Sequence, residues 1–257
     1  MEIQPMTVQK FTLKFAIASL ALASTAVIAE PIKGEAELGI VATSGNTTTE
    51  NINAKLKLTT DTPNWAHEAN LGALGSSNED ADTGVDQTTA EKYFANYKAD
   101  RKLDDRSYLY GLTTWEDDRF SGFEYQATTG VGYGYKAIAE EDKTLSFEIG
   151  PGYRYNAIDT TQAIAEEDED EATLRLGERY DWKFSETAEL NQYLTVEGGE
   201  ENTISRFGLA LKSALSGALA LRVGIDVKHT ENPAKDATGK EFDDIDTETY
   251  ATVGYSF

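Results

Sequence analysis

Apolar and polar residues alternate along most of this chain. From residue 34 onward hardly any window has the 3.6-residue spacing of an amphipathic helix, whereas runs of strict alternation about 10 to 13 residues long recur. The clearest runs cover 144–156, 171–184 and 219–228, and in the last of them apolar residues occupy every second position from Leu219 to Val227. The pattern predicts an all-β protein built from antiparallel strands.

The length of these runs bears on the solvent that surrounds them. They are longer than the five or six residues usual for a strand in a soluble sheet. A tilted strand that crosses the hydrocarbon layer needs about 9 to 11 residues, with apolar side chains toward lipid and polar ones toward the lumen. The same alternation also fits a soluble sandwich or a lipocalin-like periplasmic barrel that binds small molecules. Three further features favour the transmembrane interpretation.

The first feature is the spacing of the connections. Tight polar connections alternate with longer ones, as in outer-membrane barrels with short periplasmic turns and longer outer loops. The short set covers 61–64, 103–106, 140–143, 185–188 and 215–218. The long set covers 44–48, 76–87, 117–123, 157–170, 198–202 and 231–245. These connections predict an antiparallel up-and-down barrel of twelve strands, with ten as the alternative count, and both termini on the periplasmic side.

The second feature is the placement of aromatic residues near the ends of the apolar faces, where interfacial girdles form in membrane barrels. The residues predicted at the short-turn rim are Trp65, Tyr108, Tyr135, Trp182, Phe184 and Tyr255. Those predicted toward the other rim are Tyr93, Tyr125, Tyr153 and Tyr155.

The third feature is the last strand. Val253, Tyr255 and Phe257 share one face, and the final residue is aromatic. This resembles the C-terminal strand that the outer-membrane assembly machinery recognises, so that machinery is an expected partner.

The N-terminal segment differs from the rest of the chain. Lys10 and Lys14 precede an apolar run over 15–28, which ends in Ala29 before Glu30. This is the pattern of a secretory signal peptide, so we expect residues 1–29 to be removed and 30–257 to form a single exported domain. An uncleaved anchor is the alternative, but the run is shorter than the roughly 20 residues that a membrane-spanning helix needs. The expected location is the bacterial outer membrane.

Composition narrows the partners. The chain has 45 acidic and 23 basic side chains, a formal charge of −22, and no cysteine. The acid excess argues against nucleic acid, because phosphate binding depends on clustered Lys and Arg. Disulfides and thiol catalysis are excluded. We expect a monomer. The negative mean hydropathy of −0.47 does not by itself indicate a soluble protein, because it averages an apolar face with a polar one.

Several short motifs carry a resemblance to a known family. They are GEAELG at 34–39 with TSGNT at 43–47, WEDDRF at 115–120, GVGYGY at 130–135 and GPGYRY at 150–155. Together they resemble the domain of unknown function 481 family, the YdiY-like proteins described as salt-induced outer-membrane proteins. The resemblance spans essentially all of residues 30–257. It implies an outer-membrane β-barrel and brings no catalytic residues, and the link to salt stress comes from the family alone.

Charged residues of both signs fall on the predicted inner face. The main cluster is a strip formed by Arg154, Arg175, Arg179, Lys183, Glu148, Asp181, Arg222 and Asp226. Charges inside a narrow barrel must be wet or paired. Two interpretations stay open: an aqueous pore whose basic strip favours anionic solutes, or ladders of Arg and carboxylate that leave little free bore. The function is therefore a passive small-solute pore or a structural barrel that supports envelope integrity.

The outer connections hold acidic runs at 166–171 and 243–246. Oxygen-rich clusters can hold calcium or magnesium and bridge to lipopolysaccharide phosphates. The weak candidates are Glu166, Glu167, Asp168, Glu169, Asp170, Asp243, Asp244 and Asp246. No EF-hand spacing is present, so solvated loop tips are the simpler interpretation, and no cofactor is expected.

An enzyme is the alternative of another class. His229 lies near the outer rim of the wall, and pairing about the turn at Ser216 predicts Thr203 opposite it and Ser205 diagonal to it. A serine and histidine there would suit acyl transfer from lipid. His67, near a short turn, is expected to have an interfacial structural role. Pro151 cannot donate to the ladder, so we expect a β-bulge at that point.

Overall fold

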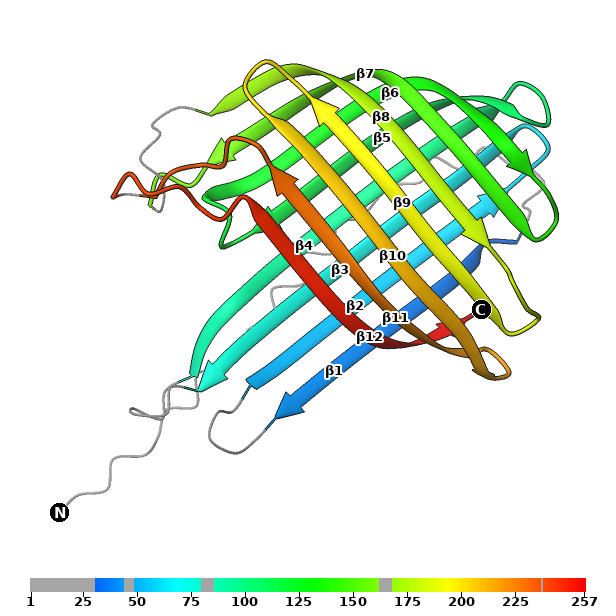
Figure 1. Cartoon of the computed structure of the whole chain (residues 1–257), viewed down its shortest axis with the longest axis horizontal. Coiled ribbons are helices and arrows are strands. Elements are labelled where there is room, and N and C mark those ends of the chain that lie inside the picture. The colour runs from blue at the N-terminus through cyan, green and yellow to red at the C-terminus, as the bar shows by residue number, and fades with distance from the viewer. Residues whose placement is uncertain (1–30, 44–48, 80–85, 162–167, 237) are drawn as a thin grey trace.

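Twelve antiparallel strands form one closed barrel (Figure 1). The computed structural model describes residues 31–43, 49–79, 86–161, 168–236 and 238–257. Each strand pairs with its neighbours in sequence, and β1 closes on β12. The strands are β1 (Lys33–Thr43), β2 (Thr49–Asp61), β3 (Trp65–Glu79), β4 (Asp86–Lys102), β5 (Ser107–Asp118), β6 (Phe123–Ala139), β7 (Lys143–Ile158), β8 (Glu169–Trp182), β9 (Ala188–Gly198), β10 (Thr203–Ser216), β11 (Leu219–Thr230) and β12 (Ile245–Ser256). The predicted fold and strand count are confirmed, and the ten-strand alternative is wrong.

The connections follow the predicted alternation of short and long. In Figure 1 the short turns gather on the right of the barrel and the longer connections on the left. We call these the short-turn end and the long-loop end. The tightest turn joins β10 to β11 at Gly217. Its φ of 54° is in the left-handed region, which glycine adopts without the steric strain that a Cβ would cause. The predicted signal peptide, residues 1–29, lies outside the described residues, so its cleavage stays a prediction.

The two faces of the wall have opposite chemistry. Every strand exposes large apolar side chains on the outer face, for example Leu38 at 52%, Val131 at 61% and Leu174 at 53%. The inner face carries charged and polar side chains, such as the buried Arg154 and Glu197. A soluble barrel or sandwich would bury its apolar face as a core, which is the reverse of this arrangement. The outer surface is therefore suited to contact with lipid hydrocarbon.

Aromatic side chains mark the short-turn rim. Trp65, Tyr135, Trp182, Phe184 and Tyr255 are all exposed on the outer face. Beside Trp65, the rings of His67 and Tyr97 continue a stacked row, and Tyr97 Oη lies 2.9 Å from His67 Nδ1. This places His67 within the aromatic row of the short-turn rim, and its interfacial role stays a prediction. Among the described residues, no helix is long and apolar enough to cross a membrane.

One aromatic residue of the predicted rim lies on the other side of the wall. Tyr108 is only 6% exposed and packs inside the barrel with Tyr110 and Leu112. Its assignment to the outer girdle is wrong. Residues 108–112 are apolar, aromatic or glycine on both faces, so alternation does not show which face points inward. Leu109 is the outward residue, at 49% exposure.

The expected bulge at Pro151 is also wrong. The register of β6 against β7 is unchanged across it, with Gly130 opposite Gly152 and Tyr133 opposite Ile149. The shifts in this pair occur elsewhere, between Phe123 and Tyr125 and between Lys136 and Ile138. Glycine explains the difference, because the two strands approach so closely here that a Cβ on Gly150 would overlap the Val131 carbonyl. The missing N–H is thus accommodated without an inserted residue.

The closure between β1 and β12 is shorter than any other strand pairing. Only four residue pairs join them, from Glu35 opposite Ser256 to Leu38 opposite Val253. Gly34 and Phe257 add two backbone hydrogen bonds of 2.8 and 2.9 Å at the short-turn end. Toward the long-loop end the two strands diverge (Figure 1). We call this pairing the seam.

Candidate functional site: the charged interior of the barrel

The inner wall is lined by ion pairs, many of them between different strands. Near the short-turn end, Lys212 Nζ lies 2.5 Å from Glu35 and the Arg222 guanidinium lies 2.8 Å from Glu37. Alternation places each of these side chains inward, and barrel closure brings β1 next to partners that are distant in sequence. Both signs are present and paired, so the lining carries little unbalanced charge.

The middle of the lumen repeats this arrangement with shared carboxylates. The Glu148 carboxylate forms ion pairs with Lys98 Nζ at 2.7 Å and with the Arg175 guanidinium at 2.8 Å. Further along β8, Arg179 lies 3.3 Å from Glu68 on β3 and 2.8 Å from Asp181. The Arg179 side chain is 45% exposed although it lies inside the barrel. The lumen at this level is therefore open to water.

A second group of charges closes the lumen nearer the long-loop end. Lys228 Nζ, on β11, lies 2.7 Å from Glu116 on β5 and 3.0 Å from the Gln126 side-chain oxygen on β6. Glu116 also forms ion pairs with Lys92 at 3.3 Å and with Arg206 at 4.0 Å. β11 and β5 are six strands apart around the barrel, so this contact crosses the lumen. We call Lys228, Glu116, Gln126, Lys92 and Arg206 the collar; the Lys228 side chain is 9% exposed.

The connection between β11 and β12 lies over the collar. Its Ala234 packs against Phe123 and Ile158, at the ends of β6 and β7 on the far side of the barrel. The Phe242 ring covers Gly122 so closely that a Cβ there would lie 2.6 Å from it, and Gly122 has a φ of 80°. In the described part of the chain, this loop and the collar together obstruct the long-loop mouth.

Below the collar a cavity of about 620 Å³ occupies the lumen toward the short-turn end. We call it the vestibule. The rings of Tyr108 and Tyr110 lie on the inner surface of β6, where Gly134 and Gly132 leave room for them. Tyr108 donates a 2.9 Å hydrogen bond to Glu148, and Lys98 Nζ lies 4.9 Å from the centre of its ring. Phe94, Tyr193 and Tyr250 line the vestibule itself, which therefore presents aromatic side chains as well as paired charges.

Comparison with known proteins identifies the family. The family model described as "Protein of unknown function, DUF481" matches residues 36–257. The chain belongs to the DUF481 family. "Uncharacterized protein YdiY" of Escherichia coli K12 is 27% identical over 230 residues, which are 88% of this chain and 84% of that protein. The predicted family resemblance is confirmed.

Solved structures similar to this DUF481 barrel include three outer-membrane proteins. The NanC porin matches with a TM-score of 0.47 at 10% identity, over 88% of this chain and 98% of that one. The COG4313 outer membrane channel from Pseudomonas putida F1 matches with 0.47 at 12% identity, over 89% and 97%. The translocator domain of autotransporter NalP from Neisseria meningitidis matches with 0.47 at 12% identity, over 89% and 88%. Similarity at this level says nothing about what passes through the DUF481 barrel.

The predicted lumen strip is divided by the structure. Arg175, Arg179, Arg222, Glu148, Asp181 and Asp226 line the vestibule. Arg154 is 1% exposed near the long-loop end, where it contacts Glu171 and donates a 2.6 Å hydrogen bond to the Asn202 carbonyl. Lys183 is exposed beyond the end of β8. Six residues of the strip therefore line the vestibule, whereas Arg154 and Lys183 do not.

His229 does not occupy the position that the turn at Ser216 predicts. A register shift between Ala214 and Ser216 places Ser205, not Thr203, directly opposite it. His229 is exposed, and in the described strands no hydrogen bond joins its ring to a serine or threonine.

The acidic candidates of the first run have protein partners where they are described, at Asp168, Glu169 and Asp170. Asp168 accepts hydrogen bonds from the Tyr155 hydroxyl and, at 3.1 Å, from the Ile158 amide, and these donors hold the pKa of the Asp168 carboxyl below its usual value. Tyr153 donates to Asp170, and Asn156 donates to Glu169 at 3.3 Å. Asp243, Asp244 and Asp246 are exposed, whereas Glu166 and Glu167 lie outside the described residues. Within the described ranges no group of three His or carboxylate side chains is arranged to hold a metal ion.

Proposed function

We propose that this protein is an integral β-barrel of the bacterial outer membrane, with short turns and both termini in the periplasm. Its lumen would be a narrow, gated route for small solutes rather than a wide anion-selective pore. The apolar outer face and the aromatic short-turn rim support membrane insertion. Paired charges in the vestibule support weak selectivity, because neither sign is left in excess to attract a counter-ion.

The observation that carries the gated route is the collar. Lys228 spans the lumen to Glu116 and Gln126, and the β11–β12 connection lies over that contact. A route through the barrel requires these contacts to separate. Removing the Lys228 ammonium leaves Glu116 with Lys92 on the neighbouring strand β4 and with the longer 4.0 Å contact from Arg206 on β10. It therefore removes the shorter of the two ion pairs that join opposite walls.

Planar-bilayer recording of the purified protein tests this proposal. We expect rare, small conductance steps from the wild type and an increase of several-fold in open probability for Lys228→Ala. Lys143→Ala is the matched control, because Lys143 pairs with Glu140 at 3.6 Å in an exposed short turn. Large, stable steps from the wild type would contradict a closed collar, as would identical traces from wild type and Lys228→Ala.

A structural barrel that supports envelope integrity is the second candidate. The density of interior ion pairs favours it, since Glu148 and Glu68 each join two basic side chains and Glu116 joins three. Silence of both wild type and Lys228→Ala in bilayers, with a barrel that still shows heat-modifiable migration, would favour this candidate over the gated route.

The partners follow from the same proposal. Val253, Tyr255 and Phe257 all point outward, with exposures of 47%, 53% and 62%, which supports presentation of this strand to the assembly machinery. Lipopolysaccharide, bridged by calcium or magnesium at the acidic outer connections, and a monomeric state remain proposals. A role in salt stress is likewise proposed from the family alone.

A further inference from the structure

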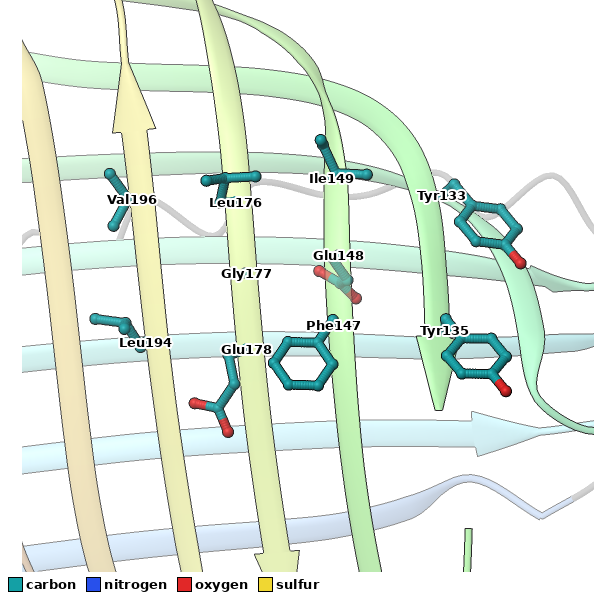
Figure 2. A pocket seen from close by; sticks show the side chains of 10 residues that line it. All are labelled: Tyr133, Tyr135, Phe147, Glu148, Ile149, Leu176, Gly177, Glu178, Leu194 and Val196. Carbon is teal, nitrogen blue, oxygen red and sulfur yellow. The ribbon is translucent and has the colours of Figure 1, made fainter. Parts of the chain in front are cut away.

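A groove of about 500 Å³ runs over the outer face of β6 to β9 (Figure 2). Its walls are apolar or aromatic and include Tyr133, Tyr135, Phe147, Ile149, Leu176 and Leu194. The exception is Glu178. In Figure 2 the Glu178 carboxylate lies beside the Phe147 ring on this outer side, whereas Glu148 lies behind the ribbon toward the lumen.

Strand pairing fixes Glu178 on the lipid-facing side. Its direct neighbours across the sheet are Phe147 on β7 and Leu194 on β9, both of which are exposed on the outer face. Along β8 it lies between Leu176 and Tyr180 on the same face. The run of residues 171–184 alternates apolar and polar except at this position, where a carboxylate replaces an apolar residue.

Glu178 lacks the partners that the inner carboxylates have. Its side chain accepts a 2.8 Å hydrogen bond from the Gln192 amide, which also lies on the outer face. No Lys, Arg or His side chain in the described ranges forms an ion pair with it, whereas Glu148, also on this part of the wall but facing inward, contacts both Lys98 and Arg175. A neutral amide orients the carboxylate but does not balance its charge.

The depth of the site indicates which molecules can reach it. Glu178 lies four residues from Trp182 of the rim, which is about 10 Å along the membrane normal for a tilted strand. Tyr133 and Tyr135 flank the groove, and tyrosine is enriched at the level of lipid headgroups. An uncompensated charge on this face is destabilising, so a cationic group that arrives from the membrane would be favoured there.

We propose that the groove binds a phospholipid whose headgroup carries a primary ammonium. The ammonium would pair with the Glu178 carboxylate beside the Phe147 ring, and the acyl chains would lie along Ile149, Leu176 and Leu194. Aromatic faces attract cations, which adds to the pairing. A primary ammonium donates hydrogen bonds to a carboxylate, whereas a choline headgroup has no N–H to donate. This inference rests on the proposed insertion of the barrel into a membrane.

Native mass spectrometry of the purified full-length barrel tests the proposal. The protein is exchanged into detergent containing phosphatidylethanolamine, phosphatidylcholine or phosphatidylglycerol, and retained lipid is counted. We expect wild type to retain the ethanolamine lipid about tenfold better than the choline lipid, and Glu178→Gln to lose that preference. Glu186→Gln, in the exposed turn between β8 and β9, is the isosteric control and should behave as wild type.

Three results would overturn the site. They are equal retention of the three lipids by wild type, unchanged preference in Glu178→Gln, and a wild-type dimer that Glu178→Gln converts to a monomer, which would make the groove an interface between copies. Heat-modifiable migration shows that each variant is folded, and Glu178→Asp, which keeps the charge, should keep the preference. Failure of the proposed function is distinguishable, because it appears in bilayer conductance or as failure to insert into vesicles, whereas lipid retention is measured on folded barrels.

Discussion

A single buried arginine joins three connections at the long-loop end. Arg154 on β7 contacts Glu171 at the start of β8 and donates hydrogen bonds to the carbonyl of Asn202 at 2.6 Å and that of Glu197 at 3.4 Å. Asn202 in turn donates to the Asn232 carbonyl at 2.6 Å, at the start of the β11–β12 connection. Through Asn202, the Arg154 guanidinium thus adds to the contacts that hold the β11–β12 connection over the mouth.

Replacing Arg154 by Ala should destabilise the folded barrel by about 3–5 kcal/mol, because it leaves the Glu171 carboxylate buried without its partner. The urea concentration at the midpoint of unfolding measures the effect, with the heat-modifiable migration of the barrel in gel electrophoresis as the readout of folding. Arg119→Ala is the control, since Arg119 is 62% exposed and lies 2.9 Å from Glu91. It should change stability by less than about 1 kcal/mol. Equal effects of the two variants would refute a special role for Arg154.

Asp236 makes the β11–β12 connection sensitive to acid. Its carboxylate accepts hydrogen bonds from the Thr238 amide at 2.8 Å, the Thr238 hydroxyl at 2.6 Å and the Lys240 amide at 3.0 Å. These donors hold the pKa of the Asp236 carboxyl below its usual 3.8. The stabilisation is therefore present above the ordinary pKa and is lost as the pH falls through the lowered value.

We expect pepsin to cleave this connection faster as the pH is lowered from about 4 to about 2. The rate at which pepsin cleaves Asp236→Asn should not show this increase, because the variant has no carboxylate to protonate. Asp243→Asn, an exposed carboxylate in the same connection, should keep the wild-type profile. A profile shared by all three proteins after correction for the enzyme's own pH dependence would contradict the assignment to Asp236.

At the scale of elements, close packing of β6 on β7 depends on glycine. A Cβ added at Gly150 would overlap the Val131 carbonyl and lie about 2.5 Å from the Gly132 Cα, whereas a Cβ at Gly111 on β5 would meet nothing within 4 Å. Gly150→Ala should therefore cost about 1–3 kcal/mol and Gly111→Ala much less. The two urea midpoints can be compared directly. Equal midpoints would mean that the strands can separate slightly at no cost.

The strands and turns could be predicted from the sequence because each depends on local information. Alternation places Leu174 outward and Arg175 inward, and polar clusters locate the turns. Prediction failed where local information is ambiguous. Residues around Tyr108 are apolar on both faces, and the bulge that moves His229 opposite Ser205 leaves no mark in the residue types near Ser216.

The interior could be predicted only in part. Alternation correctly brings Glu148 and Arg175 to the inner face, but pairing across the lumen depends on barrel closure, which no local pattern encodes. Lys92, Glu116 and Arg206 of the collar were therefore missed, although Glu116 falls in the WEDDRF motif. Glu178 could not be predicted for another reason, because alternation assigns polar residues to the lumen and this carboxylate occupies a position of the apolar face.

At the scale of the whole molecule, the seam is the strand pairing with the fewest paired residues. Leu38 and Val253 are opposite one another in it, and both are exposed on the outer face. Because the chain has no cysteine, Leu38→Cys with Val253→Cys introduces a single disulfide. We expect the oxidised barrel to gain stability, by up to about 4–5 kcal/mol if chain entropy alone acts.

The comparison of oxidised with reduced protein in urea measures this gain. Leu38→Cys with Leu221→Cys is the control, since Leu221 pairs with Val253 but lies one strand further from Leu38. It should form no intramolecular bond. If the first pair also fails to form one in a folded barrel, the seam does not have the register Leu38 opposite Val253.

The ion pairs of Arg179 and of Lys228 differ in their exposure to water, and this has a consequence for solutes. Arg179 is 45% exposed in the vestibule, whereas the Lys228 side chain in the collar is 9% exposed. Opening an exposed pair costs less than about 1 kcal/mol, so an anion or a cation that enters from the short-turn end can replace either partner. The lining would then act as a mixed-bed ion exchanger, which holds salts and zwitterions briefly at its open end and releases few of them past the collar.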